Sequence, residues 1–412
     1  MVRCRSCGES DLFSVLDLGT APPSNAYLTP EQARGPEVWL PLRMNVCTSC
    51  WLMQTEDFVS GQDVFTDDYG YFSSMSESWL RHSHDFVQSA IERFSLGPRS
   101  LVVEVAANDG YLLQYVKAAG IPCVGIEPTH STASAARDKG LPIEEVFLTQ
   151  DAADDFVAKH GQADLVVANN VIAHVPDIVD FTRGLAALLK PHGSLSIEFA
   201  YGVNLVERGQ FDTVYHEHFS YLTLTSLMDV LERAGLEAVD VQQLRSHGGS
   251  LRVTAKRLGS RREDRSDQLG DLIARECSQE VRSLQFYMGL QGVANRAKLH
   301  LLKFLIDASA TDSHVAGYGA AAKGNTLLNF SGVTFDLLPF VVDKSPGKVG
   351  RLLPGSRIPV MPVSALADEH IDSVLILPWN LTKEVLHDLD HIMRRPWSAF
   401  TAVPDFKQVS VP

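Results

Sequence analysis

Four cysteines in two C-x-x-C pairs constrain the fold of this chain more than any other feature. Cys4 and Cys7 form the first pair, and Cys47 and Cys50 form the second. Each pair fits a tight turn that points both sulfurs at one position, and four thiolates make a closed tetrahedral zinc site. A redox pair would need a thioredoxin-like βαβ context, which is missing here. Since protein would fill all four positions, we predict a structural zinc ion with no catalytic role.

The other two cysteines and the charge balance narrow the class of protein further. Cys123 falls in a predicted strand and Cys277 in a predicted helix, so we expect both to be core residues. Acidic residues outnumber basic ones by 50 to 36, and few basic residues lie near the cysteine pairs. This balance argues against a nucleic-acid partner. No apolar run is long enough to span a bilayer, and the N-terminus has no apolar signal core, so we expect a cytoplasmic protein without membrane contact.

The pattern along the chain predicts an α/β protein of three domains. Residues 1–75 are rich in loops around the cysteine pairs and form the expected zinc-binding domain. From 76 a helix is predicted to about 97, and between 100 and 256 short apolar strands alternate with helices, which is typical of a mainly parallel sheet covered by helices. We expect this domain to span 76–257. A polar stretch at 258–267 then leads into a second α/β domain, expected over 258–412.

A strand, a loop of small residues and a helix form the predicted cofactor site. The segment VEVAANDGYL at 103–112 ends an apolar strand, and Glu127 ends the next strand, where a carboxylate can bind ribose hydroxyls. This arrangement serves dinucleotides and S-adenosylmethionine alike. The G-x-G-x-x-G motif of dinucleotide folds is absent, and an acidic residue in the first strand suits a cationic amino-acid ligand, so we favour S-adenosylmethionine and methyl transfer. The expected cofactor-binding residues are Glu104, Ala106, Asn108, Gly110, Tyr111, Leu112, Glu127, Asn169 and Asn170.

A second glycine-rich turn lies in the C-terminal domain. The segment GYGAAAKGNT at 317–326 follows a predicted strand and opens a helix, so its backbone N–H groups could hold a phosphate. The alternative is a plain strand–helix turn. Cations gather near this segment in an otherwise acidic chain, which indicates an anionic substrate. The residues we expect to bind it are Lys323, Asn325, Lys344, Lys348 and Arg351.

Ionisable groups are densest in the segment FDTVYHEHFSY at 211–221. We predict that it is a loop ahead of a helix whose N-cap is Thr225, with Gly235 at its end. In an extended loop, Tyr215 and Glu217 would face one way, and His216 and His218 the other. A histidine beside a carboxylate is a good proton acceptor. A surface loop with incidental histidines, or a metal site, remains an alternative.

Two further histidines are candidates for the same site. His174, in the segment NNVIAHV, is placed to join the cleft, and the alternative is a structural histidine on a helix face. His247 lies between Ser246 and two glycines ahead of a strand, so its loop could approach a substrate, and a plain turn is nearly as good an explanation.

Taken together, these segments resemble one family, the three-domain S-adenosylmethionine-dependent sugar C-methyltransferases. The paired cysteines, DDYGYFSSMSESW, EVAANDGYL, NNVIAHVPD, FDTVYHEHFSYL, SHGGSLRV and GYGAAAKGNTLLN carry the resemblance over essentially the whole chain. It implies a zinc-binding N-terminal domain, a class I methyltransferase domain of Rossmann-like fold and a C-terminal α/β domain that helps to hold substrate. The implied substrate is a nucleotide-linked 4-keto-deoxysugar of antibiotic biosynthesis.

The resemblance also assigns roles to residues. It implies that His218 is the base, that Tyr215 and Glu217 assist it, and that Tyr69 and His174 belong to the catalytic site. Many relatives carry an aromatic residue where this chain has Met75, so the substrate pocket departs from the family pattern there. The alternatives are an O- or N-methyltransferase of another small molecule, or a binding protein with an inactive methyltransferase fold.

Overall fold

The computed structural model describes residues 2–56, 58, 72–259, 265–368, 370–393 and 396–411. They form two compact units, each assembled from separate stretches of chain. Unit 1 comprises Met1–Leu12, Cys47–Gly202 and Phe219–Arg282, and unit 2 comprises Phe13–Val46, Val203–His218 and Ser283–Pro412. The segment 203–218, which contains most of the ionisable loop, therefore groups with the C-terminal part of the chain. The three expected domain boundaries remain a prediction.

Unit 1 contains a seven-stranded sheet in the order β10-β11-β8-β7-β4-β5-β6. The five neighbouring strands β8, β7, β4, β5 and β6 are parallel to one another. Strand β11 runs antiparallel to β8, and β10 runs antiparallel to β11. The predicted mainly parallel sheet is therefore confirmed. The strands are β4 (Val102–Val105), β5 (Cys123–Ile126), β6 (Ile143–Glu144), β7 (Ala163–Asn169), β8 (Leu189–Ala200), β10 (Leu236–Leu244) and β11 (Ser250–Arg257).

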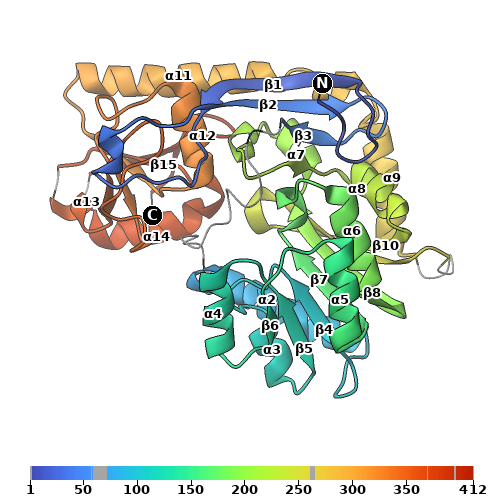
Figure 1. Cartoon of the computed structure of the whole chain (residues 1–412). Helices are drawn as coiled ribbons and strands as arrows, with labels where there is room; N and C mark the ends of the chain where they lie inside the picture. The colour runs from blue at the N-terminus through green and yellow to red at the C-terminus, as the bar shows by residue number, and fades with distance from the viewer. Residues whose placement is uncertain are drawn as a thin grey trace. The chain divides into compact units, whose positions relative to one another are not determined.

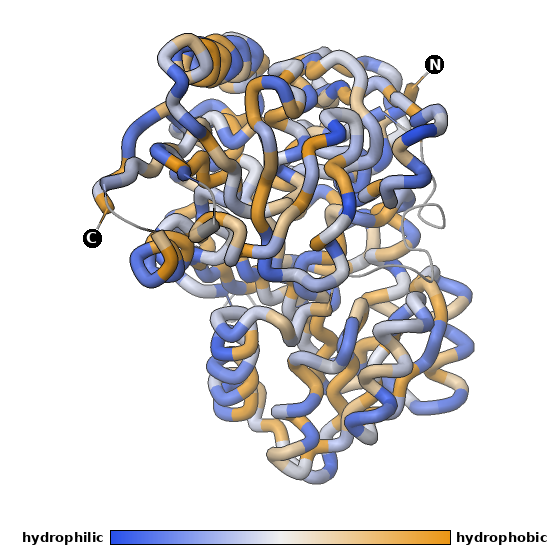
Figure 2. Tube along the Cα trace, turned by 90° about the vertical axis from the view of Figure 1, so that its left-hand side faces the viewer, coloured by the Kyte–Doolittle hydropathy of each residue, from blue (hydrophilic) through white to orange (hydrophobic). Residues whose placement is uncertain are grey.

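Helices cover this sheet because each buries one apolar side. Along the trace, hydrophobic residues alternate with hydrophilic ones in the helices (Figure 2), the pattern expected of helices with one buried face. Helix α6 packs against β8, and α5 packs against α6 (Figure 1). The helices of unit 1 are α2 (Glu77–Arg93), α3 (Leu113–Ala118), α4 (His130–Asp138), α5 (Gln150–His160), α6 (Ile178–Ala187), α8 (Leu224–Arg233) and α9 (Asp267–Ser278), with short 3₁₀ turns η2 (Ser73–Met75), η3 (Ile172–His174) and η5 (Ser246–Gly248).

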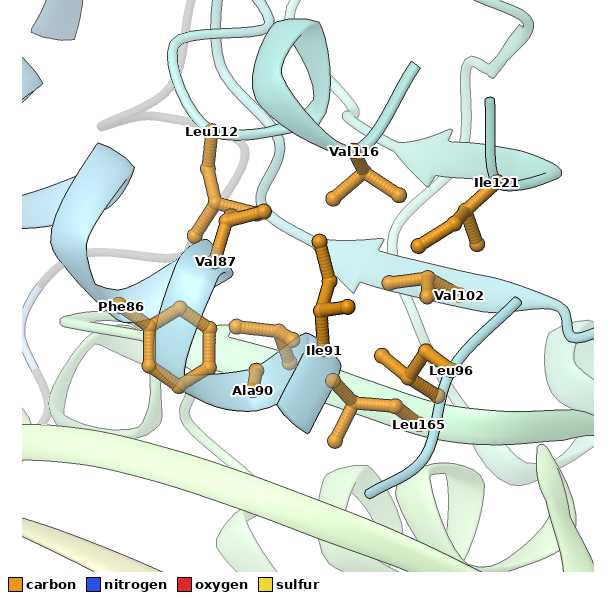
Figure 3. Close-up of a pocket in the computed structure, with 11 residues that line it drawn as sticks. Phe86, Val87, Ala90, Ile91, Leu96, Val102, Leu112, Val116, Ile121 and Leu165 are labelled. Atoms are coloured by element: carbon orange, nitrogen blue, oxygen red, sulfur yellow. The ribbon is translucent and has the colours of Figure 1, made fainter. Parts of the chain in front are cut away.

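The core between α2, α3 and β4 is closely packed. Figure 3 shows Phe86, Val87 and Ile91 of α2 pointing at Val102 and Leu112 around a small apolar space. Its volume is about 10 Å³, which barely holds one water molecule. This space is a packing gap and not a ligand site.

The N-terminus of α8 differs from the sequence prediction. Thr223 is the N-cap, and it forms a capping box with Ser226. Thr225 lies inside the helix, and its N–H and hydroxyl both donate to the buried carboxylate of Glu276, at 2.7 and 2.6 Å. The predicted stop is confirmed, since Gly235 follows the last turn at φ 72°.

The cysteines outside the two pairs behave differently from each other. Cys123 is buried in β5, as expected, but Cys277 is exposed on α9. The prediction of a core position for Cys277 is therefore wrong. The apolar positions of α9 that are buried are Leu269 and Leu272, and Cys277 lies off that side of the helix.

Unit 2 is built on a six-stranded sheet in the order β14-β13-β12-β15-β16-β17. Its strands are parallel except for β17, which is antiparallel to β16. The predicted second α/β domain is thus present. The strands are β12 (Val315–Tyr318), β13 (Val341–Asp343), β14 (Val360–Pro362), β15 (Ser373–Ile376), β16 (Ser398–Thr401) and β17 (Lys407–Val409).

Helices and a pair of longer strands complete unit 2. The helix α11 runs beside β1 (Figure 1), where the N–H of Asp17 donates to Gln291 at 2.7 Å. The remaining elements are β1 (Leu12–Ala21), η1 (Gln32–Arg34), β2 (Leu40–Cys47), α7 (Gly202–Glu207), η4 (Phe211–Thr213), α10 (Leu284–Tyr287), α11 (Leu290–Ala310), α12 (Ala322–Ser331), α13 (Ala365–Asp368), η7 (Trp379–Leu381) and α14 (Thr382–Ile392). The short strands β3 (Met53–Thr55) and β9 (Ser220–Tyr221) pair with each other in unit 1.

Among the helices of the described part of the chain, none combines the length and apolar character that crossing a membrane requires.

Candidate functional site

The two cysteine pairs sit on turns of the same geometry. In the first, the N–H of Gly8 donates to the carbonyl of Cys4 at 2.9 Å, and in the second the N–H of Trp51 donates to the carbonyl of Cys47 at 2.9 Å. Gly8 and Trp51 both have positive φ, 78° and 62°. These turns direct the two cysteines of each pair toward one point.

The four sulfurs meet as a zinc site requires. All four lie within 4.8 Å of one another, with Cys4 to Cys50 at 3.4 Å and Cys7 to Cys47 at 3.5 Å. Zinc–sulfur bonds of about 2.3 Å place tetrahedral sulfurs about 3.8 Å apart, so the cluster fits zinc. Burial raises the pKa of Cys7 to about 11, so a cation is needed to hold all four as thiolates. The prediction that the four cysteines of the two pairs come together as metal ligands is therefore confirmed.

The loop after β4 is the expected cofactor loop, and its backbone is unusual. Ala106, Asn108 and Gly110 have φ of 58°, 49° and 75°. A Cβ on Gly110 would lie 2.2 Å from the Leu141 side chain, so only glycine fits. Left-handed non-glycine residues cost energy and gather at functional sites.

Glu127 holds this loop from the end of β5. Its carboxylate accepts the N–H of Asn108 at 2.9 Å, the N–H of Thr129 at 3.0 Å and the hydroxyl of Thr132 at 3.0 Å. Burial raises its pKa. A carboxylate has about four acceptor positions, so room remains for about one further donor. That Glu127 binds both ribose hydroxyls stays a prediction.

The turn η2 lies against the cofactor loop, which sequence reasoning missed. The N–H of Ser73 donates to Asn108 at 2.8 Å, and the hydroxyl of Ser74 bonds to Asp109. Lys139 donates to the carbonyl of Asp109 at 2.6 Å. These partners lie about 30 residues away from the loop, and no local pattern announces them.

Buried polar atoms without partners gather at the carboxyl ends of β4 and β7. Among the described residues, no hydrogen bond reaches either oxygen of Glu104, either amide atom of Asn169 or the Nδ2 of Asn170. Burial raises the pKa of Glu104 well above its usual value. Since β4 and β7 are neighbours in the sheet, these groups lie close together. A ligand with a cationic group and hydrogen-bonding atoms would satisfy them, and the aminoacyl part of S-adenosylmethionine has both.

The expected cofactor residues are mostly covered by protein. Ala106 and Asn170 are partly exposed, while the other seven are buried. The side chain of Leu112 points into the core space of Figure 3, so a cofactor role for it would have to be a backbone one. Glu104 is fully buried in β4, so it would act on a bound cofactor through its charge.

The ionisable loop in unit 2 is a turn and not an extended segment. The hydroxyl of Tyr215 lies 2.8 Å from the Nε2 of His218, and their rings are 4.0 Å apart. The Nδ1 of His218 lies 3.2 Å from the carbonyl of Thr213. The prediction that Tyr215 and His218 face opposite ways is wrong, because the N–H of His218 bonds to the carbonyl of Tyr215 at 3.0 Å and closes a turn.

These contacts assign the proton on the His218 ring. A carbonyl only accepts, so Nδ1 carries the hydrogen and donates to Thr213. The neutral ring then presents the lone pair of Nε2, to which Tyr215 donates. His218 and Tyr215 are both partly exposed. The arrangement is that of a base with an attached phenol.

Glu217 and His216 are buried on either side of this turn. Glu217 accepts the N–H of Asn25 at 3.1 Å, and burial raises its pKa. The Nε2 of His216 lies 3.1 Å from the carbonyl of Pro41, and burial lowers its pKa. Among the described residues, the four cysteines are the one group whose possible metal-ligating atoms lie close enough together to bind an ion. A metal site at 216–218 is therefore not supported.

The loop is fastened to the glycine-rich segment of unit 2. The hydroxyl of Thr326 on α12 donates to the carbonyl of Val214 at 2.9 Å, and the indole of Trp379 donates to Asp212 at 2.8 Å. Lys323 lies over the Trp379 ring at 4.7 Å. Burial raises the pKa of Asp212 to about 6, and Lys323 opposes that shift.

The expected substrate-binding residues of unit 2 fall into two groups. Lys348 donates to the carbonyl of Ala320 at 2.7 Å, and Lys323 donates to Asn380 at 2.8 Å, so both lie at the glycine-rich turn. Lys344 pairs with Asp388 at 2.6 Å, and Arg351 is exposed. Asn325 is buried and donates to the carbonyl of Ser24 at 2.7 Å.

The remaining residues that we expect in the site lie in unit 1 or outside the described residues. His174 ends η3 and is partly exposed, and His247 lies in η5. Met75 is 71% exposed on η2. Tyr69 lies outside the described residues. None of these positions tests the expected role.

Three family models match consecutive parts of the chain. A zinc binding domain matches residues 4–65, a methyltransferase domain matches residues 79–241, and a C-methyltransferase C-terminal domain matches residues 245–404. Together with the strand order of unit 1, the four-cysteine cluster and the fit of the cofactor loop, they define the protein as a class I S-adenosylmethionine-dependent methyltransferase with a zinc-binding N-terminal domain.

The chain belongs to the C-methyltransferase family. C-methyltransferase NovU of Streptomyces niveus is 33% identical over 407 residues, which are 99% of this chain and 96% of NovU. Ubiquinone biosynthesis O-methyltransferase of Escherichia coli is 25% identical over 158 residues, 35% of this chain and 65% of that protein. Magnesium protoporphyrin IX methyltransferase of Synechocystis PCC 6803 superposes with a TM-score of 0.35 at 16% identity, over 43% of this chain and 83% of that one, a likeness too low to support a conclusion. The protein is thus an enzyme that transfers a methyl group from S-adenosylmethionine to carbon.

Proposed function

We propose that this enzyme methylates the carbon next to the ketone of a nucleotide-linked 4-keto-deoxysugar, as part of deoxysugar biosynthesis for an antibiotic. A carbon that carries hydrogen is not nucleophilic until it loses a proton, and a neighbouring ketone makes that loss possible. C-methylation therefore needs a base and a group that stabilises an enolate, and the Tyr215–His218 pair offers both. This pair is the observation that carries the proposal.

The base in this scheme is the Nε2 of His218. The bond from Nδ1 to Thr213 fixes the tautomer and the ring orientation, so the lone pair of Nε2 is ready to accept a proton. When the substrate carbon approaches, Tyr215 gives up its bond to Nε2. Its O–H can then turn to the developing enolate oxygen, which Tyr69 could also serve. Donors of this kind contribute about 3 kcal/mol each.

The remaining site residues position the reactants. Bound S-adenosylmethionine would supply a methyl group on a sulfonium centre for in-line transfer to the carbon nucleophile. Ala106 and Asn108 shape the loop that would hold it, Asn170 would contact it from the end of β7, and Glu104 would balance its positive charge. Glu217 and His174 would assist, by holding the catalytic turn and by lining the substrate side respectively.

The glycine-rich turn of unit 2 is the proposed place for the nucleotide diphosphate. Lys323 and Lys348 lie at this turn, and burial lowers the pKa of both. A diphosphate would supply the negative charge that such buried ammonium groups favour. Asn325, Lys344 and Arg351 are the further residues we assign to this role.

Solvent exchange tests the proposed base. In D₂O with S-adenosylhomocysteine and no methyl donor, the wild-type enzyme should exchange the hydrogen next to the ketone for deuterium. His218→Asn should slow that exchange and methyl transfer by about 10²–10⁴-fold, while the affinity for S-adenosylmethionine stays near normal. His192→Asn, at an exposed histidine of β8, is the matched control. Normal exchange by His218→Asn would rule out this residue as the base.

A further inference from the structure

A buried ion cluster in unit 1 plays no part in the reaction described so far. Glu198 near the end of β8 is fully buried, and three segments converge on its carboxylate. Arg252 of β11 donates at 2.6 Å, Ser246 of η5 donates at 2.9 Å, and the Nε2 of His82 on α2 lies at 2.8 Å. We call these four residues the Glu198 cluster.

The cluster lies in the row of side chains next to the cofactor loop. Within the sheet, Glu198 is paired with Asn169 of β7 on one side and with Arg252 of β11 on the other, so the three side chains share one face. The N–H of Asn170 donates to the carbonyl of Glu198 at 2.7 Å. The aromatic ring of Trp79 lies 4.8 Å from His82 and 5.8 Å from Tyr111 of the cofactor loop. The cluster is therefore continuous with the expected cofactor residues.

The charges inside the cluster are already balanced. Burial raises the pKa of Glu198, but His82 and Arg252 more than offset it and the pKa is lowered, so Glu198 stays ionised beside the guanidinium. An anionic ligand group would be repelled by the carboxylate of Glu198, and a cationic one would be repelled by the guanidinium of Arg252. The cluster therefore suits an uncharged ligand group.

His82 is the member that can reach such a group. Its side chain is 23% exposed, against 0% for Glu198 and 11% for Arg252. The Nε2 of His82 lies 2.8 Å from the carboxylate of Glu198 and 2.9 Å from the Nη2 of Arg252. Because an ionised carboxylate only accepts, Nε2 carries a hydrogen, and in the neutral ring Nδ1 is then the acceptor. In the described part of unit 1, no hydrogen bond reaches Nδ1.

We propose that His82, held by Glu198 and Arg252, is a binding residue for a hydroxyl group of the acceptor in unit 1. The Nδ1 atom accepts the hydrogen of that hydroxyl, and the Trp79 ring stacked on His82 provides a flat wall for the adjoining carbon atoms. His82 thereby fixes which ring carbon of the acceptor faces the methyl group. This inference rests on the proposed sugar substrate.

Acceptor kinetics under saturating S-adenosylmethionine test this role. His82→Phe should raise the KM for the ketosugar about 5- to 20-fold, the loss expected for one buried hydrogen bond, while kcat stays within about threefold. The affinity for S-adenosylmethionine should be unchanged by calorimetry. His82→Gln, which keeps an amide toward Glu198 and an acceptor outward, should recover most of the KM. His84→Phe, on the same helix but 50% exposed, should behave as wild type.

An unchanged KM in His82→Phe, or a loss of cofactor affinity as large as the rise in KM, would overturn the inference. Should His82→Phe fail to fold, ¹⁵N-histidine spectra of the wild-type complex with S-adenosylhomocysteine decide. The Nδ1 resonance that disappears in His82→Gln must shift when the ketosugar is added, and a stationary resonance refutes the role. A wild-type enzyme that methylates no ketosugar would instead refute the proposed function.

Discussion

At the scale of single residues, the proposed reactive pair, Tyr215 and His218, makes contacts within six positions of the chain. Thr213 accepts from one nitrogen of His218, and Tyr215 donates to the other. Both partners come from the loop that carries the histidine, so the tautomer is set locally. The neighbouring His216 and Glu217 are buried and bind backbone groups of Pro41 and Asn25. In this short turn, Tyr215 and His218 are the proposed reactive residues, while His216 and Glu217 hold the turn in place.

Asp212, at the start of this loop, makes stability depend on pH. Its pKa is raised by burial from the usual range to about 6, so its protonated form is favoured in the folded protein. That stabilisation is present below the unfolded pKa and is lost as the pH rises through about 6. Relative to Asp212→Asn, the free energy of unfolding of the wild type should therefore fall by up to about 3 kcal/mol between pH 4 and pH 7.

Urea unfolding at a series of pH values measures this difference. Asparagine keeps an acceptor for the Trp379 indole but cannot ionise, so the comparison isolates the carboxyl proton. Asp271→Asn, which removes an exposed carboxyl, should give a curve parallel to the wild type. Parallel curves for Asp212→Asn as well would contradict the assignment.

At the scale of elements, the cofactor loop depends on one glycine for two reasons. Gly110 has φ of 75°, and an added Cβ would meet Leu141 at 2.2 Å. Gly120 has a similar φ of 73° but open space around the Cβ position. Gly110→Ala should weaken S-adenosylmethionine binding more than tenfold, because the loop must shift. Gly120→Ala should cost only the strain of a positive φ, about 1 kcal/mol.

Calorimetric titration of both variants with S-adenosylhomocysteine, alongside thermal unfolding, separates strain from displacement of the loop. Equal affinities for Gly110→Ala and Gly120→Ala would show that the shape of this loop does not control cofactor binding.

Most of the elements follow from local sequence, and the exceptions have physical reasons. The parallel strands and the helix α2 are visible as apolar runs and helical spacing, because burial imposes those periods. The turn at Tyr215–His218 is not visible in the sequence. The predicted alternation of side chains assumes an extended chain, and the single backbone hydrogen bond from His218 to Tyr215 turns the chain back. The N-cap of α8 lies two residues before the predicted Thr225, whose N–H and hydroxyl donate instead to Glu276 on another helix.

At the scale of the whole molecule, each unit is built from three separate stretches of the chain. The sequence predicts consecutive domains, but the segment 203–218 groups with residues 283–412. The bonds from Thr326 to Val214 and from Trp379 to Asp212 join positions more than 100 residues apart. Such pairings leave no local pattern, which is why the contacts that support the proposed catalytic turn could not be predicted from the sequence. The catalytic roles of its residues stay a prediction.

The zinc site gives a prediction at this scale. Cys47→Ser should lower bound zinc well below one equivalent and should lower the unfolding temperature, because zinc binding is coupled to folding of the segments that carry the cysteines. Methyl transfer should fall only as far as folded protein is lost, since the closed site offers no position to substrate. Metal analysis and calorimetry measure both effects. Cys277→Ser, at an exposed cysteine, is the control. Full zinc content in Cys47→Ser would contradict the four-cysteine site.

Carbon methylation of a ketosugar is the central claim, and one spectrum tests it most directly. Nucleotide-linked 4-keto-6-deoxysugars, labelled with ¹³C in the ring, are incubated with the enzyme and S-adenosylmethionine that carries a ¹³C methyl group. The product should show the methyl carbon coupled through one bond to the ring carbon next to the ketone. A methyl signal without one-bond coupling to carbon, as on oxygen or nitrogen, would contradict the account, and so would an absence of product from every such sugar.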